Sequence, residues 1–151
     1  SVLRDAKEEA QLALADLRHL AHGIHPAVLT ERGLMPAIEA LTERMPIPVI
    51  MKGELNHRFD PTVEAAAYYL VSEALANAVK HARATRVEVV VAESGGLLDV
   101  AVSDDGIGGA SFQGGSGLRG LHDRIGALSG TLQITSAADA GTRVTAHLPC
   151  R

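Results

Sequence analysis

Large aromatic side chains are scarce in this chain, and it has no excess of positive charge. Its 151 residues include no tryptophan, two tyrosines and two phenylalanines. A hydrophobic content of 46% still supports a packed core, which Ala, Val, Leu and Ile must therefore supply. The formal net charge of -4 argues against direct nucleic-acid binding, because such binding needs a basic surface.

Disulfide bonds and membrane-spanning segments are not expected either. Cys150 is the only cysteine, so no internal disulfide can form, and a reducing compartment is indicated. No apolar run approaches the roughly 18 residues that suggest a membrane span, and the charged N-terminal residues do not resemble a signal peptide. These absences predict a cytoplasmic segment that makes no membrane contact.

Residues 1–25 carry apolar side chains in a seven-residue repeat. One position of the repeat is occupied by Leu3, Ala10, Leu17 and Ile24, and the other by Ala6, Ala13 and Leu20. This spacing predicts a helix with a narrow apolar seam, as in a bundle or coiled coil, which ends at Pro26. Because one such helix alone is weakly stable, we expect a helical partner. The chain begins inside this pattern, which indicates a fragment of a longer protein.

The rest of the chain predicts helices alternating with short strands. Asp60 is a suitable N-cap and Pro61 takes the favoured first helical position, so a long helix is expected over residues 61–81. Gly95-Gly96 marks a hairpin turn. The other expected elements are helices at Leu34–Arg44 and 118–128, and strands at Pro48–Lys52, Thr85–Glu93, Leu97–Asp104, Thr131–Ser136 and Thr142–Leu148. This order favours α+β layers over a doubly wound sheet.

The stretch Asp104-Asp105-Gly106-Ile107-Gly108 follows an apolar strand. Side chains of a strand alternate between its faces, so Asp104 shares the apolar face and Asp105 points the opposite way. An inward carboxylate needs a hydrogen-bond donor, and a ligand amino group would serve, with the glycines allowing close approach to the backbone. From this segment alone, an ordinary structural turn is an equally good interpretation.

The long helix predicts an apolar stripe and a polar one. The apolar stripe consists of Val63, Ala67, Val71, Ala74 and Ala78, and the polar one of Glu73, Asn77, Lys80 and His81. An acid, an amide, a cation and an imidazole on one face can polarise water, complete a Mg²⁺ shell and contact phosphate. The alternative is the solvated polar face of an amphipathic helix.

Two further features point to a ligand site. The glycine-rich run from Gly114 to Leu121 leads into a helix, and backbone N–H groups at a helix start bind anions; a flexible loop is the alternative. Thr142 shares the strand face of Val144, so its hydroxyl is expected to point inward and to need a polar partner.

Together these motifs resemble the GHKL ATPase superfamily. YYLVSEALANAVKHA (68–82) looks like its N box, DDGIG its G1 box, GSGLRGL its G2 box and Gly141-Thr142 its closing glycine-threonine pair. Their order and spacing are those of histidine-kinase catalytic domains, and LRHLAHGIHPAVLTERGL (17–34) resembles the junction region of NarL-type sensor kinases. The implied fold is α+β: a two-layer α/β sandwich with a mixed sheet, helices on one face and a preceding N-terminal helix.

The resemblance implies roles for individual positions. Asp104 would accept a hydrogen bond from the adenine amino group of ATP, with Thr142 supporting it directly or through water. Asn77 would bind Mg²⁺, and Glu73 matches the acid proposed in the superfamily as a general base or water-orienting group. The other implied positions are Gly106 and Gly108 at the adenine, Lys80 and His81 near the phosphates or ribose, and Gly115, Gly117, Leu118 and Gly120 at the lid hinge and helix start.

A phosphoacceptor histidine followed by an acidic residue is not found where this family needs it. The candidates His19, His22 and His25 are followed by Leu, Gly and Pro, and His122-Asp123 lies inside the nucleotide lobe, where a helix-surface pair is expected. The resemblance therefore implies that the acceptor helix precedes this sequence. The implied domains are 1–25 as the second helix of a dimerisation hairpin, 26–33 as a junction, and 34–151 as the catalytic domain.

The leading hypothesis is thus a sensor-kinase catalytic domain that holds Mg·ATP for transfer to a histidine outside this sequence. The implied partners are the dimerisation domain of its own full-length chain, in a homodimer, and a response regulator of the LuxR/NarL type. Two alternatives remain: a GHKL serine kinase of the anti-sigma type, and a noncatalytic dimerisation module that signals by nucleotide occupancy.

Overall fold

The computed structural model describes residues 2, 4–10, 26–80, 83–108 and 116–150. Its elements are α2 (Ala27–Arg32), α3 (Leu34–Glu43), β1 (Val49–Lys52), α4 (Pro61–Lys80), β2 (Val87–Ser94), β3 (Leu97–Asp104), α5 (Ser116–Ala127), β4 (Thr131–Ser136) and β5 (Thr142–Pro149). Residues 4–10 are helical as well; the rest of the helix predicted for residues 1–25 lies outside the described residues. Helix α2, within the junction, was not predicted.

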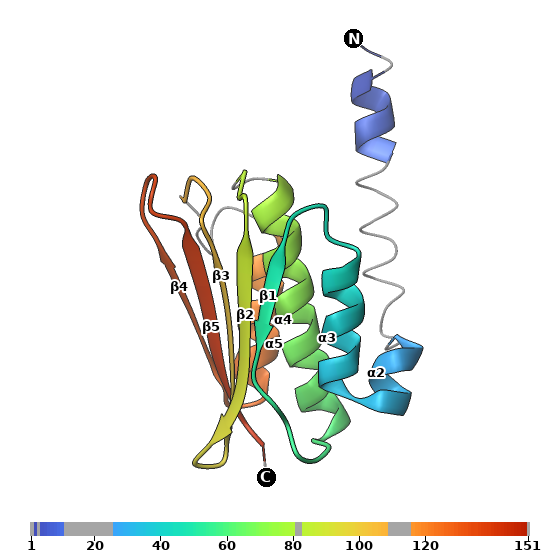
Figure 1. The fold of residues 1–151 in the computed structure, drawn as a ribbon, viewed down its shortest axis with the longest axis vertical. Helices are drawn as coiled ribbons and strands as arrows, with labels where there is room; N and C mark the ends of the chain where they lie inside the picture. Colours follow the sequence, from blue (N-terminus) through green and yellow to red (C-terminus); the bar gives the residue numbers. More distant parts are fainter. Residues whose placement is uncertain (1, 3, 11–25, 81–82, 109–115, 151) are drawn as a thin grey trace.

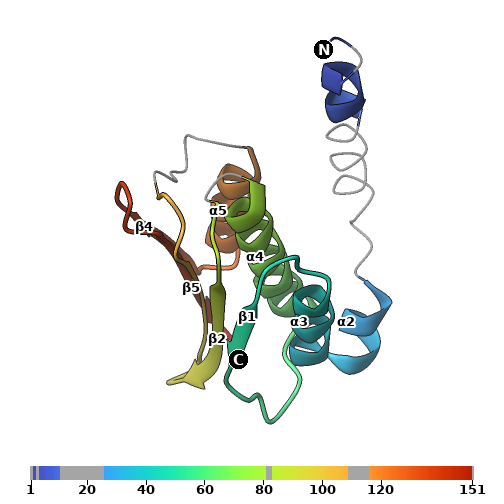
Figure 2. The same cartoon turned by 45° about the horizontal axis from the view of Figure 1, so that its top comes forward.

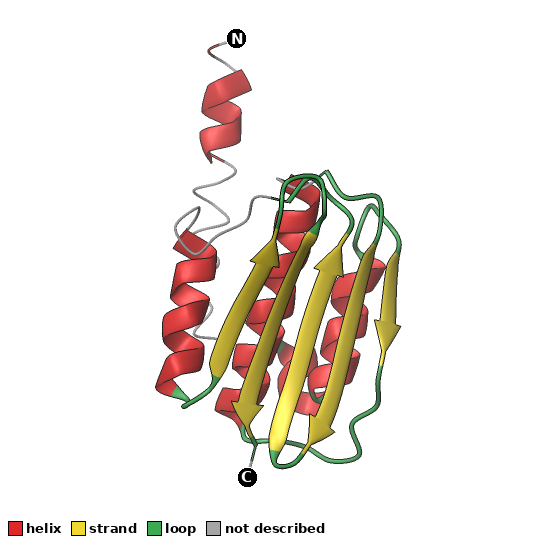
Figure 3. Ribbon diagram, turned by 90° about the vertical axis from the view of Figure 1, so that its left-hand side faces the viewer, coloured by secondary structure: helices red, strands yellow, loops and turns green. Residues whose placement is uncertain are grey.

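Five strands form one mixed sheet whose helices lie on a single face (Figures 1, 2 and 3). The strand order is β1-β2-β3-β5-β4. β1 runs parallel to β2, and the other neighbouring strands are antiparallel. This arrangement confirms the predicted α+β fold with two layers. No helix among the described residues combines the length and apolar character needed to span a membrane.

Helix α4 is the central element of the helical layer. It packs against α2, α3 and α5 as well as against the sheet, so it is buried on several sides rather than along one stripe. The predicted apolar stripe is buried, and so are Ala65, Ala66, Tyr69, Leu70 and Leu75. Small alanine side chains let the neighbouring elements approach closely, which suits a core poor in aromatics because protein interiors are close-packed.

The start of α4 follows the sequence prediction. Oδ1 of Asp60 accepts hydrogen bonds from the backbone N–H of Thr62 at 2.9 Å and from its hydroxyl at 2.6 Å, and Pro61 is the first helical residue. The Thr62 hydroxyl and N–H groups lower the pKa of Asp60. One N–H group that the helix leaves without a partner is thereby satisfied.

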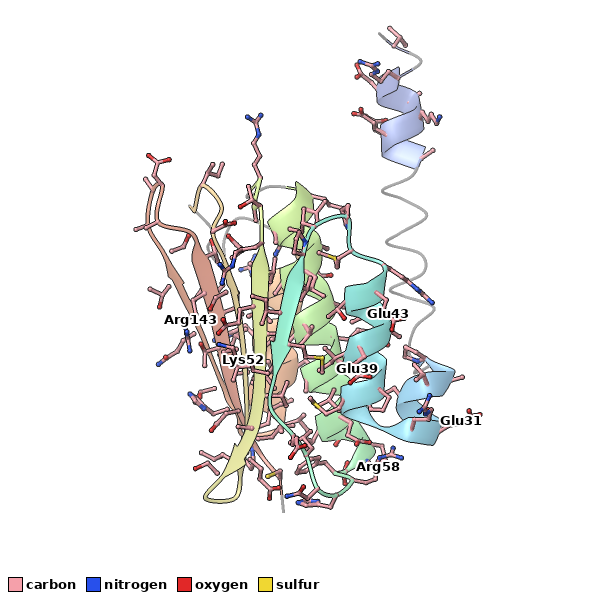
Figure 4. The ribbon with its side chains drawn as sticks, in the orientation of Figure 1. Glu31, Glu39, Glu43, Lys52, Arg58 and Arg143 are labelled. Carbon is pink, nitrogen blue, oxygen red and sulfur yellow. The ribbon has the colours of Figure 1, made fainter. Side chains whose placement is uncertain are left out.

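An ion pair between the half-exposed Arg58 and the buried Glu64 ties the junction to the start of α4. Glu64 is 2% exposed, and its carboxylate accepts hydrogen bonds from Nε of Arg58 at 3.0 Å and Nη2 at 2.9 Å. The same Nη2 donates to the carbonyl oxygens of Leu29 and Thr30 in α2, both at 3.2 Å, and Figure 4 shows Arg58 beside that helix. Gly33, with φ of 95°, leaves room for the arginine, because a Cβ there would lie 3.0 Å from Cδ of Arg58.

At the other end of the sheet, the exposed carboxylate of Asp105 binds the residues that precede β2. Asp105 accepts hydrogen bonds from the Thr85 hydroxyl and from the backbone N–H groups of Thr85 at 2.7 Å and Arg86 at 3.1 Å. These hydrogen bonds lower the pKa of Asp105 to about 2, and the bond from the Thr85 hydroxyl contributes most. They also explain why β2 begins at Val87 rather than at the predicted Thr85, since the preceding N–H groups are directed to Asp105 and not to a neighbouring strand.

Replacing Arg58 with alanine is expected to destabilise the fold by about 3 kcal/mol, because it leaves a buried carboxylate without its partner. The double variant Arg58→Met with Glu64→Met should unfold at higher urea concentration than Arg58→Ala, since it also removes the buried charge. Lys52→Ala is the control: its pair with Glu88, at 3.3 Å, is largely exposed and is worth at most about 1 kcal/mol. Equal losses in Arg58→Ala and Lys52→Ala would contradict the importance of the pair between Arg58 and the buried Glu64.

Asp105→Asn is expected to lower the free energy of unfolding at neutral pH. The folded-state pKa of about 2 lies below the ordinary 3.8, so this stabilisation is present above about pH 4 and is lost as the pH falls through about 2. Urea unfolding at neutral pH and near pH 2 should show a wild-type advantage that shrinks in acid. Asp123→Asn, at a side chain 80% exposed, is the control. An advantage that does not change with pH would refute the assignment.

Candidate nucleotide-binding site

Most residues singled out from the sequence gather at one end of the molecule, the upper end in Figure 1. Helix α4 and strand β3 both finish there, the β4–β5 turn lies there, and α5 begins there. Of the predicted site residues, His81 and Gly115 lie outside the described residues.

A row of three polar side chains crosses the sheet at this end. Asp104 is paired with Thr142 between β3 and β5, and Thr142 with Ser136 between β5 and β4. Directly opposed residues point to the same face, and this face carries the buried Val102 and Val144. The alternation of side chains along a strand therefore correctly predicted that Asp104 and Thr142 point inward.

The described residues satisfy the carboxylate of Asp104 only in part. Its Oδ1 accepts a hydrogen bond from the backbone N–H of Gly106 at 2.8 Å, which fixes the turn. Its other oxygen has no hydrogen-bond partner within the described ranges, although the side chain is half-buried. Such an oxygen is suited to accept a hydrogen bond from a ligand.

Two glycines hold the turn after β3 against the β4–β5 turn. Gly108 and Gly141 both have φ of 75°, and a Cβ on either would collide with a carbonyl oxygen, that of Ala137 or of Asp104 respectively. The backbone N–H of Asp139 also donates to the carbonyl of Ile107 at 2.7 Å. Both positions therefore require glycine because two backbone segments touch there. The sequence interpretation had placed Gly108 at the adenine.

Glu73, a residue of the polar stripe of α4, faces the beginning of α5. A Cβ on Gly117 would lie 2.7 Å from Cδ of Glu73, so any side chain there would require Glu73 to move. Asn77 is half-buried, and its amide has no hydrogen-bond partner in the part of the chain that the structure describes. Lys80 is exposed at the last residue of the helix. An amide oxygen with no protein partner is a suitable ligand for Mg²⁺.

Helix α5 begins two residues earlier than predicted, at Ser116. Leu118 is 6% exposed and belongs to the core. Gly120 faces solvent, and a Cβ there would meet no atom within 4 Å, so no contact among the described residues requires a glycine. His122 lies on the exposed side of α5, 3.8 Å from the Asp123 carboxylate, which confirms the prediction of a helix-surface pair.

Ser136 was missed by the sequence analysis. Its Oγ lies 2.9 Å from Oγ1 of Thr142, and it occupies the same inner face of β4 as Leu132 and Ile134. Counting back along the strand from the buried Leu132 would have predicted this direction. The pairing with Thr142 requires the register of the two strands, which the sequence does not give.

A separate hollow of about 270 Å³ lies at the opposite end of the molecule. It is lined by Arg32, Gly33, Leu34, Met35, Pro36, Leu55, Asn56, His57, Arg58 and Glu64. It contains none of the residues expected at the nucleotide, and its acid, Glu64, is already paired with Arg58. The described residues include no group of three or more His, Cys, Asp or Glu side chains placed to hold a metal.

Comparison with known proteins gives consistent results. The histidine kinase DegS of Brevibacillus brevis, a signal-transduction kinase/phosphatase, is 32% identical over 97% of this chain and 40% of its own length. The oxygen sensor histidine kinase NreB of Staphylococcus carnosus is 33% identical over 89% of this chain and 41% of its own length. This chain thus spans about two fifths of these curated relatives.

Solved structures show the same likeness. The histidine kinase domain of the blue-light-activated histidine kinase of Erythrobacter litoralis superposes with a TM-score of 0.58 at 28% identity, over 75% of this chain and 56% of that one. Residues 62–151 match the family described as histidine kinase-, DNA gyrase B-, and HSP90-like ATPase. The match covers more than half of the sequence and includes every motif at the upper end of the fold. The chain therefore belongs to this ATPase family.

Proposed function

We propose that this chain is the ATP-binding catalytic part of a sensor histidine kinase, which holds Mg·ATP for phosphoryl transfer to a histidine of a dimerisation domain. The observation that carries the proposal is the inward polar row at the end of β3, opposite a polar stripe on α4. Among the described residues, one carboxylate oxygen of Asp104 and the amide of Asn77 have no hydrogen-bond partner. These are the two groups that would bind the amino group of adenine and a magnesium ion.

At the adenine end, the chain provides recognition and rigidity. The open oxygen of Asp104 would accept a hydrogen bond from the exocyclic amino group, while Gly106 holds the other oxygen of the same carboxylate. Thr142, 8% exposed, would complete the contact directly or through water. Gly108 keeps the neighbouring turn close enough for the base to lie beside backbone atoms.

At the phosphate end, the chain would provide positive charge and backbone N–H groups. Lys80 and His81 would lie near the phosphates or ribose, and the start of α5, with Gly115, Gly117, Leu118 and Gly120, would face the phosphate oxygens. Asn77 would bind Mg²⁺, whose charge offsets that of the phosphates during transfer. Catalysis would therefore rest on positioning and charge neutralisation.

Glu73 is the proposed catalytic acid–base or water-orienting residue. Its carboxylate packs against the first turn of α5 at Gly117, between the metal-binding amide one helical turn further on and the segment that faces the phosphates. This location suits a group that orients the incoming nucleophile.

The proposed domain organisation places 1–25 in a dimerisation hairpin, 26–33 in a junction and 34–151 in the catalytic domain. The chain would act in a cytoplasmic homodimer and pass its phosphoryl group to a response regulator of the LuxR/NarL type. Both curated relatives named above are histidine kinases, which supports a histidine acceptor over the serine of an anti-sigma kinase.

Asp104→Asn is expected to weaken binding of a nonhydrolysable ATP analogue with Mg²⁺ by about 10- to 100-fold, because a charge-assisted hydrogen bond to the adenine is lost. Isothermal titration calorimetry measures the affinity. Asp105→Asn is the matched control, since the adjacent carboxylate faces Thr85 and Arg86 and should not contribute to affinity. Unchanged affinity in Asp104→Asn, or equal losses in both variants, would count against the site.

Incubation with radiolabelled ATP and a separately expressed histidine-bearing hairpin is expected to label the hairpin. The phosphate should be labile in acid and stable in base, as phosphohistidine is, and Asn77→Ala should abolish the labelling. Acid-stable phosphate on a serine would favour the anti-sigma alternative. Nucleotide binding without transfer, also in the full-length dimer, would favour a noncatalytic module.

A further inference from the structure

The imidazole of His57 lies between two hydrogen-bond acceptors. His57 belongs to the segment between β1 and α4 and lines the hollow opposite the candidate nucleotide site. Its Nε2 lies 2.7 Å from Oε2 of Glu93, near the end of β2, and its Nδ1 lies 2.9 Å from the backbone carbonyl oxygen of Arg58. One side of the ring packs against the buried Phe59, with 4.4 Å between the ring centroids.

Two acceptors around one imidazole require two N–H groups. A carbonyl oxygen and an ionised carboxylate can only accept, and a neutral imidazole has a single N–H. In either neutral form, one ring nitrogen would therefore present a lone pair to an oxygen at hydrogen-bond distance. The imidazolium donates from both nitrogens, so the contacts of His57 fit its protonated form. The Arg58 carbonyl and then the Glu93 carboxylate accordingly raise the pKa of His57 above its ordinary 6.5.

Other charged and titratable groups face this ring from the neighbouring elements. Cys150, which follows β5, lies 4.0 Å from the second carboxylate oxygen of Glu93. Burial raises the pKa of that thiol above its ordinary 9.0, so it adds no negative charge near neutral pH. Arg32 of α2 and Glu64 of α4 line the same hollow as the ring, and Glu64 is paired with Arg58. Glu93 therefore provides the negative charge that the imidazolium contacts directly.

The segment that His57 fastens to the sheet also holds α2. The carbonyl oxygen that accepts from the imidazole belongs to Arg58, whose guanidinium donates to Glu64 in α4 and to the carbonyl oxygens of Leu29 and Thr30 in α2. Arg58 is thus attached to the helices through its side chain, and to β2 through its carbonyl and His57. Release of one attachment leaves the other to hold the segment alone.

We infer that His57 is a pH-sensitive clasp: in its protonated form it fastens the Arg58 segment to β2, and loss of the proton releases this attachment and loosens α2. The folded-state pKa lies above the ordinary 6.5, so the stabilisation is fully present below pH 6.5 and is lost as the pH rises through the folded-state pKa. Because α2 lies in the proposed junction, the attachment of the junction to the catalytic part would depend on pH near neutrality.

Amide hydrogen exchange on the 151-residue chain tests the clasp. After correction for the intrinsic effect of pH on exchange, protection of the α2 amides should fall by about 5-fold between about pH 6 and about pH 8.5. Protection in β3, which reports on global unfolding, should change less. His57→Gln, which cannot titrate, should abolish the pH dependence in α2. Glu93→Gln should move it to lower pH, since a charge that favours the imidazolium is lost.

His147→Gln is the matched control. Nδ1 of His147 also contacts a carboxylate, 2.5 Å from Oδ1 of Asp99, but His147 lies in β5 on the sheet face away from the buried Ala146 and Leu148. This variant should keep the pH dependence of the unchanged protein, and its loss there would overturn the inference.

Three further results would also overturn the inference. They are an unaltered pH dependence of α2 in His57→Gln, a transition at unchanged pH in Glu93→Gln, and equal losses of protection in α2 and β3, which would mean global unfolding. None of these measurements uses a nucleotide, so failure of the clasp is distinguishable from failure of the proposed function.

Discussion

Contact between two backbone turns is the constraint on which the candidate site depends. The turn after β3 and the β4–β5 turn touch through main-chain atoms, with the Asp139 N–H donating to the Ile107 carbonyl at 2.7 Å and with Gly108 and Gly141 at distances that exclude a Cβ. Both glycines also have positive φ, which other residues rarely adopt. Because the main chain sets this contact, the polar row of Asp104, Thr142 and Ser136 is held in place independently of any ligand.

Helix α4 connects this site to the junction at the other end of the molecule. Its 20 residues span about 30 Å, with Glu64 paired to Arg58 near its first turn and Glu73 against Gly117 in its second half. Burial between the sheet and the neighbouring helices leaves α4 little freedom to move by itself. The carboxylates in its two halves have different surroundings: Glu64 is buried and its charge is compensated by Arg58, whereas Glu73 faces the helix start at the candidate phosphate end.

Local patterns predicted much of this structure because their causes are local. The N-cap Asp60, the hairpin at Gly95-Gly96 and the inward direction of Asp104 each follow from a few neighbouring residues. The parallel pairing of β1 with β2, the Thr142–Ser136 pair and the role of Arg58 depend on segments far apart in sequence. Arg58 in particular reads as an ordinary surface charge until Glu64 and the carbonyls of α2 are seen around its guanidinium group.

The glycines of the motifs also show why a resemblance and a structure give different information. A motif treats its glycines as equivalent, but their surroundings differ: Gly108 and Gly141 meet backbone atoms, Gly117 meets the end of one flexible side chain, and Gly120 meets nothing within 4 Å. A side chain at the first two positions would separate the turns, because a carbonyl oxygen cannot rotate away as a side chain can. At Gly117 the cost depends on whether Glu73 can move, which links tolerance at that position to the proposed catalytic acid. At Gly120, packing among the described residues gives no reason for glycine.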